Sequence, residues 1–361
     1  MLGVHVDDTA LGGAGPEFRL AVEKLRARFP YRKWRVNSGE FCGAFYEQDP
    51  KTKVIRMSMK NCAEKLRPAN IKRGVSPETP LDAMQQRTLR AINGSLNWLA
   101  SQSRPDISAQ TSISQQAFPN PKIRHLRHAN NVVRRARMHS DLTITFTPIK
   151  PEKLTVVCHS DAAFANVGDY TQSGHIIAFT ETSLQDGQVA AWCPITWQSH
   201  KLTRAVSSTL AAESQSLATA SGTVEWIMLL LSEVLDGPFK LRDCREKLSV
   251  RKPILVTDCK SLYDHLMSPS APTAIEDRRT SIDVVIIRES IRSLSAFMRW
   301  VPTDRMLADA LTKDQGDPLD MLRSCLKSSV YQISPEDHVL RMQAKEREDR
   351  LQKRLKPSSP N

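Results

Sequence analysis

The spacing of apolar residues divides the second half of the chain into three strands followed by alternating helices and strands. Runs of apolar and β-branched residues predict the strands, and longer segments with apolar residues three and four positions apart predict the helices. In chain order we expect strands at 154–160, 173–180 and 190–198, a helix at 207–234, a strand at 253–258, helices at 259–267 and 279–294, a strand at 296–302 and a helix at 305–312. This order indicates an α/β (α+β) fold, in which helices flank a mixed sheet.

The first half of the chain has a different pattern. Residues 16–29 predict an amphipathic helix, and residues 41–46 and 53–59 predict two paired strands. A proline-containing linker at 67–81 then leads to a helix at 83–101. The apolar positions predict a buried face for each helix, which is Phe18, Val22, Leu25 and Phe29 on the first and Leu89, Ile92, Leu96 and Leu99 on the second.

The composition is that of a globular protein with an excess of positive charge. The 361 residues are 40% hydrophobic, and their formal net charge is +12. Such a charge indicates a polyanionic partner, either nucleic acid or an anionic membrane surface. Against the membrane, no apolar run approaches the roughly 20 residues that span a bilayer, and the longest is at 226–231. Residues 1–8 lack the basic and apolar regions of a signal peptide, so we expect an intracellular protein of the cytoplasm or nucleus.

The positive charge is concentrated in one stretch. Between Ile107 and Ser140 there is no Asp or Glu. One interpretation of this stretch is a solvated helix face, and the other is a track whose cations hold nucleic-acid phosphates without reading sequence. The candidate nucleic-acid-binding residues are Lys122, Arg124, Arg127, Arg134, Arg135 and Arg137.

Four acids each lie beside an apolar element, and we expect them to meet. Asp161 and Asp258 end predicted strands, Glu213 lies in an Ala/Ser-rich helix, and Asp309 lies in the last predicted helix. Acids often occupy such positions for structural reasons alone. Carboxylates that converge, however, can hold two divalent ions about 4 Å apart, one to activate water and one to stabilise the leaving oxygen of a phosphodiester. Hard oxygen ligands favour Mg²⁺ or Mn²⁺.

The seven cysteines do not extend this set of ligands. They are odd in number and show neither paired spacing nor a Cys-x-x-Cys motif, which indicates reduced thiols. Cys158 and Cys259 lie close in sequence to Asp161 and Asp258. Because Mg²⁺ avoids sulfur, we expect both thiols to be packing residues.

Short motifs surround the four acids. They are Cys158-His-Ser-Asp161, Thr171-Gln-Ser-Gly-His175, Ile195-Thr-Trp-Gln-Ser199, Ser207-Ser-Thr209 before Glu213, Thr257-Asp258, and Trp300-Val-Pro-Thr303 before Leu307-Ala-Asp309-Ala-Leu-Thr-Lys313. In order and content the series resembles the RNase H domain of copia-type retrotransposon polyproteins. The resemblance implies an RNase H-like mixed sheet and hydrolysis of the RNA strand of an RNA–DNA hybrid to a 3′-hydroxyl and a 5′-phosphate. By position it implies that Asp161, Glu213, Asp258 and Asp309 are the catalytic residues and metal ligands.

Two departures from the family pattern concern this site. The family reaches its Glu one residue sooner after Ser-Ser-Thr, but Glu213 is the only carboxylate available there. The family also has a His where this chain has Ile275-Glu-Asp-Arg278, and a His near the metals would assist proton transfer or product release.

The beginning of the chain resembles another part of the same polyproteins. Leu2-Gly-Val-His-Val-Asp7-Asp8 is similar to the hairpin that presents paired carboxylates in a reverse transcriptase palm. The family supplies a further catalytic Asp upstream, so we expect Asp7 and Asp8 to be relics and polymerase activity to be absent. The resemblance divides the chain into a truncated palm and primer-grip-like region at 1–66, a basic connection region at 67–150, an RNase H-like domain at 151–330 and a charged helical tail at 331–361.

Three functional interpretations therefore remain open. The first is an RNase H-like endonuclease that uses two Mg²⁺ or Mn²⁺ ions, with an RNA–DNA hybrid and other polyprotein parts as partners. It would select RNA by 2′-hydroxyl contacts and hybrid shape. The second is a catalytically inactive nucleic-acid-binding remnant of a retrotransposon polyprotein. The third is a protein-interaction module that keeps only the folded scaffold.

Overall fold

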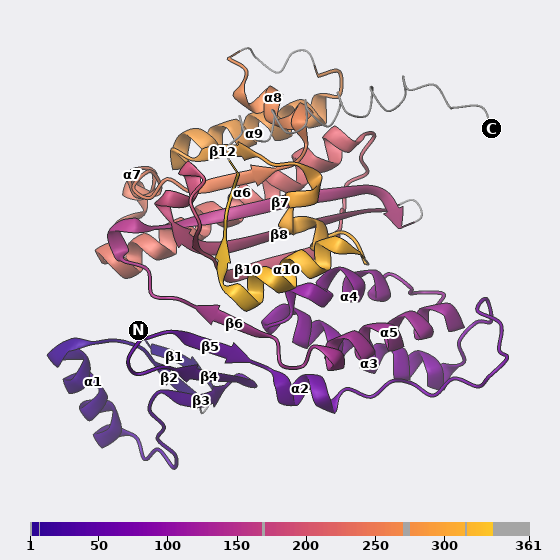
Figure 1. Cartoon of the computed structure of the whole chain (residues 1–361), viewed down its shortest axis with the longest axis horizontal. Helices are drawn as coiled ribbons and strands as arrows, with labels where there is room; N and C mark the ends of the chain where they lie inside the picture. Colours follow the sequence, from indigo (N-terminus) through magenta and orange to yellow (C-terminus); the bar gives the residue numbers. More distant parts are fainter. Residues whose placement is uncertain (1, 7, 168–169, 270–274, 315, 335–361) are drawn as a thin grey trace, which may run out of the picture.

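The computed structural model describes the chain except for residues 1, 7, 168–169, 270–274, 315 and 335–361 (Figure 1). The described residues of the second half form a large sheet flanked by helices, and those of the first half form a smaller sheet beside a group of helices. Most of the predicted tail at 331–361 lies outside the described residues, as does Asp7.

The large sheet has five strands and is mixed. Its strand order is β10-β8-β7-β11-β12, with β8 antiparallel to both of its neighbours and with β11 parallel to β7 and β12. The predicted mixed sheet with flanking helices is thereby confirmed. The strands are β7 (Leu154–Val167), β8 (Tyr170–Glu181), β10 (Cys193–Lys201), β11 (Ile254–Thr257) and β12 (Phe297–Trp300).

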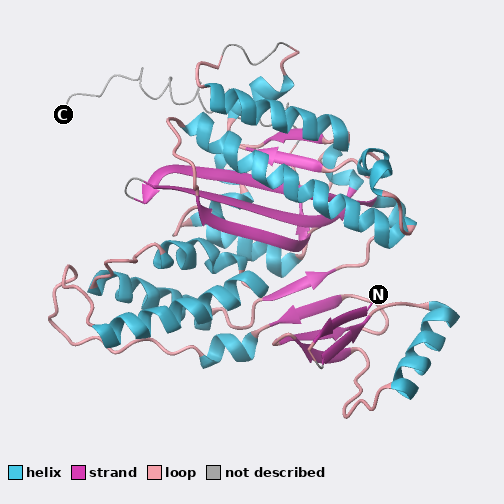
Figure 2. Cartoon of the chain, turned by 180° about the vertical axis from the view of Figure 1, so that it is seen from behind, coloured by secondary structure: helices cyan, strands magenta, loops and turns pink. Residues whose placement is uncertain are grey.

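Two long helices and two shorter ones cover one face of this sheet. Side chains alternate between the two faces of a strand, so Val156 and Cys158 of β7 pack with Val224 and Ile287 of the covering helices. Figure 2 shows these helices in front of the sheet. The helices on this face are α6 (Thr209–Asp236), α7 (Cys244–Leu248), α8 (Lys260–Met267) and α9 (Arg278–Leu294).

The opposite face of the sheet packs against helices of the first half of the chain and against elements within residues 307–328 of the second half. Val157 of β7 belongs to a single buried core together with Leu96, Leu126 and Leu307. The predicted buried face of the 83–101 helix is confirmed, because its four apolar residues are at most 8% exposed. The elements of this layer are α3 (Ala83–Gln102), η1 (Pro105–Ile107), α4 (Ser108–Gln115), α5 (Ile123–Met138), η7 (Leu307–Leu311) and α10 (Asp317–Ser328).

The smaller sheet is antiparallel and has the strand order β3-β4-β5-β6. The predicted pairing of 41–46 with 53–59 is confirmed as β4 with β5, and β6 joins them from far along the sequence. The elements of this region are β1 (Leu2–His5), β2 (Asp8–Leu11), α1 (Gly15–Arg28), β3 (Ser38–Phe41), β4 (Ala44–Gln48), β5 (Ile55–Ser58), α2 (Lys60–Lys65) and β6 (Thr143–Phe146).

Two sequence predictions about helices are wrong in part. Helix α1 forms, but none of its residues is buried, and Phe29 just beyond its end is 52% exposed. The predicted helix at 305–312 is instead two short 3₁₀ turns, η6 (Thr303–Arg305) and η7. Every residue from 306 to 311 is buried, so this segment is enclosed on all sides and has no exposed helical face. Short 3₁₀ turns are the tighter path that such connectors adopt.

Helix α6 modifies the expectation that no segment is apolar over a length sufficient to cross a membrane. By length and composition it is apolar enough to cross a membrane, and 39% of its most apolar 18-residue window is buried inside the protein. A core helix passes the same test, and α6 packs on β7 and α9. The remaining short elements are η2 (Pro151–Lys153), η3 (Thr182–Asp186), β9 (Ala190–Ala191), η4 (Leu241–Asp243) and β13 (Val330–Tyr331).

Candidate metal centre

Asp161 lies in β7, which has a neighbouring strand on each side. It pairs with Gly174 of β8, and the residue is 5% exposed. Its carboxylate accepts a hydrogen bond from the hydroxyl of Thr312, which follows η7. The sheet therefore holds this carboxylate where little water can reach it.

Glu213 lies near the start of α6, and three serine hydroxyls hold that part of the helix against the sheet. Oγ of Ser216 is 2.9 Å from Oγ of Ser160 and 2.7 Å from Oγ of Ser173. The same hydroxyl donates a hydrogen bond to the backbone oxygen of Asp161 at 3.0 Å. Because residues three apart lie on one face of a helix, Glu213 is held close to Asp161.

Asp258 directly follows β11, and two neighbours fix it. The indole nitrogen of Trp300 donates a hydrogen bond to its backbone oxygen at 2.9 Å. The Thr303 hydroxyl donates to Oδ2 of its carboxylate at 2.7 Å. Both donors come from the end of β12 and the turn after it, so the parallel pair β11–β12 sets the direction of this carboxylate.

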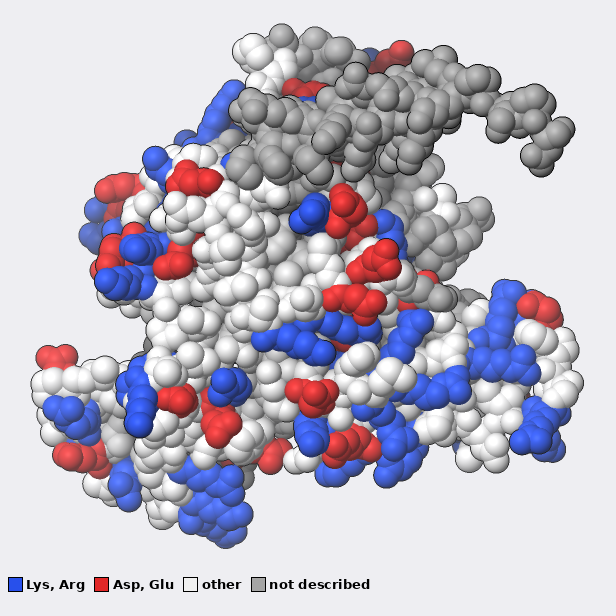
Figure 3. Space-filling view, viewed as in Figure 1, with Lys and Arg blue, Asp and Glu red and all other residues white. Residues whose placement is uncertain are grey.

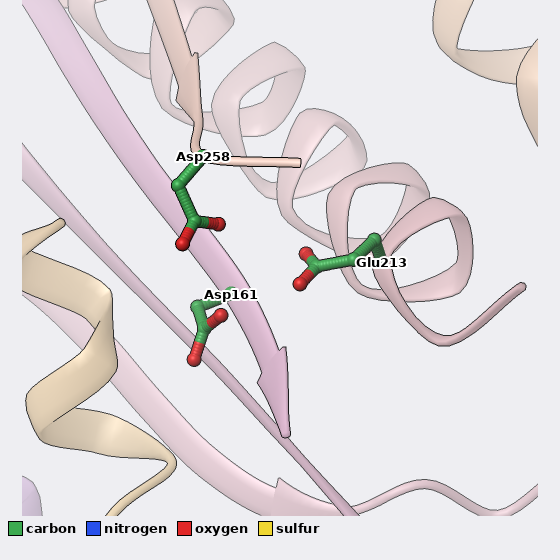
Figure 4. A group of neighbouring side chains, drawn as sticks. All are labelled: Asp161, Glu213 and Asp258. Atoms are coloured by element: carbon green, nitrogen blue, oxygen red, sulfur yellow. The ribbon is translucent and has the colours of Figure 1, made fainter. Parts of the chain in front are cut away.

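The three carboxylates converge (Figure 4). One oxygen from each of Asp161, Glu213 and Asp258 lies within 4.8 Å of the other two. They come from a strand, a helix and a strand end that are far apart in sequence. At such distances like charges repel by several kcal/mol at an effective dielectric constant of about 20, so an uncompensated cluster is unfavourable.

This repulsion and the burial of the cluster appear in its pKa values. Burial, with the nearby charges of Asp309 and Asp258, raises the pKa of Asp161 to about 8. Burial and the charges of Asp161 and Asp258 also raise the pKa of Glu213 well above its usual value. Burial raises the pKa of Asp258 too, although the hydrogen bond from Thr303 opposes the shift. A bound cation would lower these pKa values, because it stabilises the ionised carboxylates.

Asp309 lies beside this three-acid group but is not part of it. It is carried by η7 and is 2% exposed, and its Oδ2 forms an ion pair with Nζ of Lys313. Burial alone would lower the pKa of Lys313, but the hydrogen bond and charge of Asp309 raise it. Among the described residues no hydrogen-bond partner of Oδ1 is found, although that atom is buried.

Gly174 makes this position of η7 possible. A Cβ atom built on Gly174 would lie 2.5 Å from Cβ of Leu311 and 3.0 Å from its backbone carbonyl. No other residue type fits there without moving the turn that carries Asp309. The glycine opposite Asp161 therefore controls how closely the fourth acid approaches.

The donor set fits a divalent cation of the hard type. It offers carboxylate oxygens alone, from Asp161, Glu213 and Asp309, which are buried, and from Asp258, which is half-buried. Oδ1 of Asp309 has no hydrogen-bond partner among the described residues. Cys158 packs in the α6–α9 core, where burial raises the pKa of its thiol, so it is a packing residue. Oxygen-only sites suit Mg²⁺ or Mn²⁺.

Comparison with known proteins finds relatives of the kind that the motifs indicated. No family model matches the chain. The chain is 28% identical over 225 residues to the retrovirus-related Pol polyprotein from transposon RE1 of Arabidopsis thaliana, and 27% identical over 228 residues to that from transposon RE2. The resemblance to copia-type retrotransposon polyproteins is confirmed. Each match covers 62% of this chain and 14% of the polyprotein, so the chain spans about one seventh of those relatives' length.

Solved RNase H structures are similar to part of the chain. RNase H1 from the halophilic archaeon Halobacterium salinarum NRC-1 has 15% sequence identity and a TM-score of 0.29, covering 43% of this chain and 92% of that one. LC11-RNase H1 in complex with RNA/DNA hybrid has 10% identity and a TM-score of 0.29, covering 44% of this chain and 93% of that one.

Two further sequence features, the predicted polymerase pair and the stretch 275–278, lie outside the acid cluster. Of the predicted polymerase pair, Asp7 lies outside the described residues, and Asp8 is exposed at the start of β2, which pairs with β1. In the stretch where the family has a His, the Asp277 carboxylate caps α9 by accepting a hydrogen bond from the backbone nitrogen of Arg279 at 3.0 Å. A helix cap thus occupies that place in the sequence.

The structure divides the six predicted nucleic-acid-binding residues. Lys122 and Arg124 both pair with Glu78 at 2.7 Å. Arg135 donates to the backbone oxygen of Asp314 at 2.6 Å, so it ties α5 to the segment after η7. Figure 3 shows Lys and Arg gathered over the α3–α5 end of the molecule. Arg127 and Arg134 also donate hydrogen bonds, to the backbone oxygen of Val75 and to the side chain of Asn131. Of the six residues, Arg124, Arg134 and Arg137 are exposed, and the other three are half-buried.

Several residues of the site escaped the sequence reasoning. Lys313, Thr312 and Gly174 lie inside the quoted motifs, but the motifs alone assign them no role. The four-residue spacing of Asp309 and Lys313 was a signal, because such a pair meets on one helical turn. A glycine inside a strand was another signal, because it often marks the close approach of another backbone.

Proposed function

We propose that this chain is a retroelement-derived RNase H-like endonuclease that cleaves the RNA strand of RNA–DNA hybrids. The observation that carries the proposal is the convergence of Asp161, Glu213 and Asp258 within 4.8 Å. The similarity to retrotransposon Pol polyproteins supports the substrate class. The net charge of +12 is that of a protein with a polyanionic partner.

The proposed ligands of the ions are the three converging acids together with Asp309. Two Mg²⁺ or Mn²⁺ ions in such a site supply an activated water and a stabilised leaving oxygen for phosphodiester hydrolysis. The buried Oδ1 of Asp309, which has no hydrogen-bond partner among the described residues, is the ligand atom that a second ion would use.

The chain's own residues orient the site. Thr303 and Trp300 hold Asp258, and Thr312 holds one oxygen of Asp161, which leaves its other oxygen for an ion. Lys313 balances part of the negative charge by pairing with Asp309. Buried carboxylates held by neutral hydroxyls keep their positions when the substrate binds, which is the pre-organisation that catalysis needs.

Two observations favour the alternative of a catalytically inactive nucleic-acid-binding remnant. Lys313 already neutralises Asp309, one of the four proposed ligands. In addition, the stretch 275–278 supplies no His for proton transfer. In that alternative the cluster would still bind a cation, but hybrid would be bound and never cut.

Cleavage of a labelled RNA–DNA hybrid in Mg²⁺ or Mn²⁺ separates the two functions. Asp258→Asn should lower the cleavage rate by about 100-fold or more, because it removes a carboxylate ligand of the proposed ions, which would stabilise the charge of the reacting phosphate. It should leave the hybrid affinity nearly unchanged, since no basic residue is altered. Asp304→Asn, an exposed acid in the next turn, is the matched control and should cut like the wild type. Wild-type protein that binds the hybrid but never cuts it would establish the remnant instead.

A further inference from the structure

The linker that follows α2 and helix α5 together form a second cleft, which the proposed metal centre does not use. Its volume is about 430 Å³. One wall comes from the linker and the other from one face of α5. Its polar lining is Lys72, Arg73, Arg127, Asn130, Asn131 and Arg134.

The cleft is built by specific contacts on both sides of the linker cations. The Asn130 side chain accepts a hydrogen bond from the backbone nitrogen of Ala69 at 2.7 Å and donates one to its backbone oxygen at 2.9 Å. Arg127 donates to the backbone oxygen of Val75 at 2.7 Å. Residues 69 and 75 are thus tied to α5, and Lys72 and Arg73 between them are held over the cleft.

The two segments that line the cleft carry no acid to balance its positive charge. Neither the stretch 67–77 nor α5 contains an Asp or Glu. The next acid in the sequence, Glu78, is engaged by Lys122 and Arg124. Within the described residues neither Lys72 nor Arg73 has an ion-pair partner, and both are exposed. Cations gathered in this way repel one another, and an anion with several charges relieves that repulsion.

The guanidinium groups add a geometric preference. Arg134 is oriented by a hydrogen bond to the side chain of Asn131, one turn earlier on α5. Arg127, Asn131 and Arg134 follow one another at the spacing of a single helix face. Guanidinium groups bind phosphate oxygens in pairs, whereas a carboxylate partner is absent from the described lining.

We propose that this cleft binds consecutive phosphates of a nucleic-acid backbone, at a place separate from the acid cluster. The inference rests on the proposed function for the identity of the polymer, and it assigns Lys72 and Arg73 a role in binding. Of the six predicted residues, only Arg127 and Arg134 line the cleft. Lys122 and Arg124 pair with Glu78, Arg135 bonds to the backbone oxygen of Asp314, and Arg137 lies outside the lining. The cleft holds the strand without reading its sequence.

The test measures how hybrid affinity depends on salt, with the full chain in EDTA so that no divalent ion contributes. The probe is a short fluorescent RNA–DNA hybrid. Lys72→Ala/Arg73→Ala should weaken binding and reduce the slope of log affinity against log salt by about two units, because each neutralised phosphate adds about 0.9 to the slope. The matched control is Arg245→Ala/Lys252→Ala, which removes two exposed cations at the α7 side of the molecule, away from α5 (Figure 1). The control should change the slope far less.

Three results would overturn the cleft. The first is an unchanged slope in Lys72→Ala/Arg73→Ala, and the second is an equal decrease in both double variants, which would reflect net charge alone. The third is a site for small phosphates: inorganic pyrophosphate would raise the thermal unfolding midpoint of the wild type only, while the hybrid slope stayed unchanged in the variant.

Cleavage by the wild type in Mg²⁺ is measured separately, so the two proposals can fail independently. If Lys72→Ala/Arg73→Ala reduces the salt slope but the wild type never cuts the hybrid, the proposed binding role of the cleft holds and the proposed endonuclease activity is refuted. Normal cutting with an unchanged slope in the variant would do the reverse.

Discussion

At the scale of single residues, the folded protein holds several carboxylates close together, and their mutual repulsion lowers its stability. Asp161 and Glu213 are nearly buried, and apart from Lys313 the cluster is held by neutral hydroxyls. A sequence optimised for stability alone would place apolar side chains at these positions, because burying charges without full compensation costs several kcal/mol. The arrangement is understandable if a cation supplies the missing charge.

The metal-free protein should lose stability as the pH rises. Burial and neighbouring acids raise the pKa of Asp161 from its ordinary value of 3.8 to about 8 in the folded state, so the folded state binds the proton more tightly than the unfolded state does. The stability from this proton is complete below the unfolded pKa and is lost as the pH rises through about 8. Urea unfolding in EDTA between pH 5 and pH 9 measures this slope.

Two controls accompany that measurement. Asp161→Asn should be more stable than the wild type at high pH in EDTA, because it removes the group that must ionise. Saturating Mg²⁺ should flatten the slope of the wild type, since the ion replaces the proton. A wild-type slope that neither Mg²⁺ nor Asp161→Asn alters would mean that other groups cause it.

At the scale of elements, the sequence predicted the strands and helices whose apolar residues recur at a regular spacing. It did not predict the conformation of a segment that is buried on all sides. The strands and helices of the large sheet follow their apolar patterns, and β7 and β8 run longer than predicted because they extend beyond their apolar cores as a hairpin. The segment 305–312 has no such one-sided pattern, because neighbours surround it. The position of Asp309 depends on that segment and was therefore not predictable from periodicity.

The same limit applies to the basic residues. The absence of acids between Ile107 and Ser140 drew attention to α5 as a basic surface. It could not reveal that Glu78, far outside this stretch, folds back onto Lys122 and Arg124. Charge pairing across the linker is a tertiary feature, so the sign of this surface is predictable from the sequence, but which of its cations remain available is not.

Gly174→Ala tests the approach of η7 to the sheet. The added methyl group would lie 2.5 Å from Cβ of Leu311, so η7 must move away and take Asp309 with it. We expect a loss of stability of about 1–3 kcal/mol, as for an overpacked core, together with reduced cleavage. Urea unfolding and the hybrid cleavage assay measure the two effects.

Gly222→Ala on α6 is the matched control. A Cβ atom there meets nothing within 4 Å, so the substitution should stabilise the helix by up to about 1 kcal/mol and leave cleavage unchanged. If Gly174→Ala behaved like Gly222→Ala, the contact between Gly174 and Leu311 would not position the fourth acid.

At the scale of the whole molecule, the predicted connection region (67–150) and the predicted RNase H-like domain (151–330) share one core. Besides the common apolar cluster, the indole of Trp197 in β10 donates to the backbone oxygen of Ala100 in α3 at 2.8 Å. Gln172 of β8 donates to the hydroxyl of Ser112 in α4 at 2.8 Å. We therefore expect the predicted boundary near residue 151 to mark a change of motif and not a division between independently stable units.

A buried ion cluster joins the same two parts. Asp106, in the connection region, is fully buried and binds Arg104 at 2.7 Å and Arg323 of α10 at 3.1 Å. Burial alone would raise the pKa of Asp106, but the two guanidinium groups hold it below its usual value. Arg104 also donates to the backbone oxygen of Ala136 in α5 at 2.9 Å, so the cluster connects η1, α5 and α10.

Asp106→Asn should destabilise both parts of the protein together. Removing this charge leaves two guanidinium groups without their shared carboxylate in the core, at a cost of about 3–5 kcal/mol. Asp320→Asn is the matched control, because it removes the exposed carboxylate that pairs with the same Arg323 and should cost at most about 1 kcal/mol. Urea unfolding is followed by tryptophan fluorescence, and Trp98 in α3 and Trp300 in β12 report on the two parts. Each part is followed in a variant that keeps a single tryptophan, either Trp98 or Trp300. If the two parts form one unit, both variants should unfold at the same urea concentration, and Asp106→Asn should shift both transitions equally. Separate transitions would establish two independent domains.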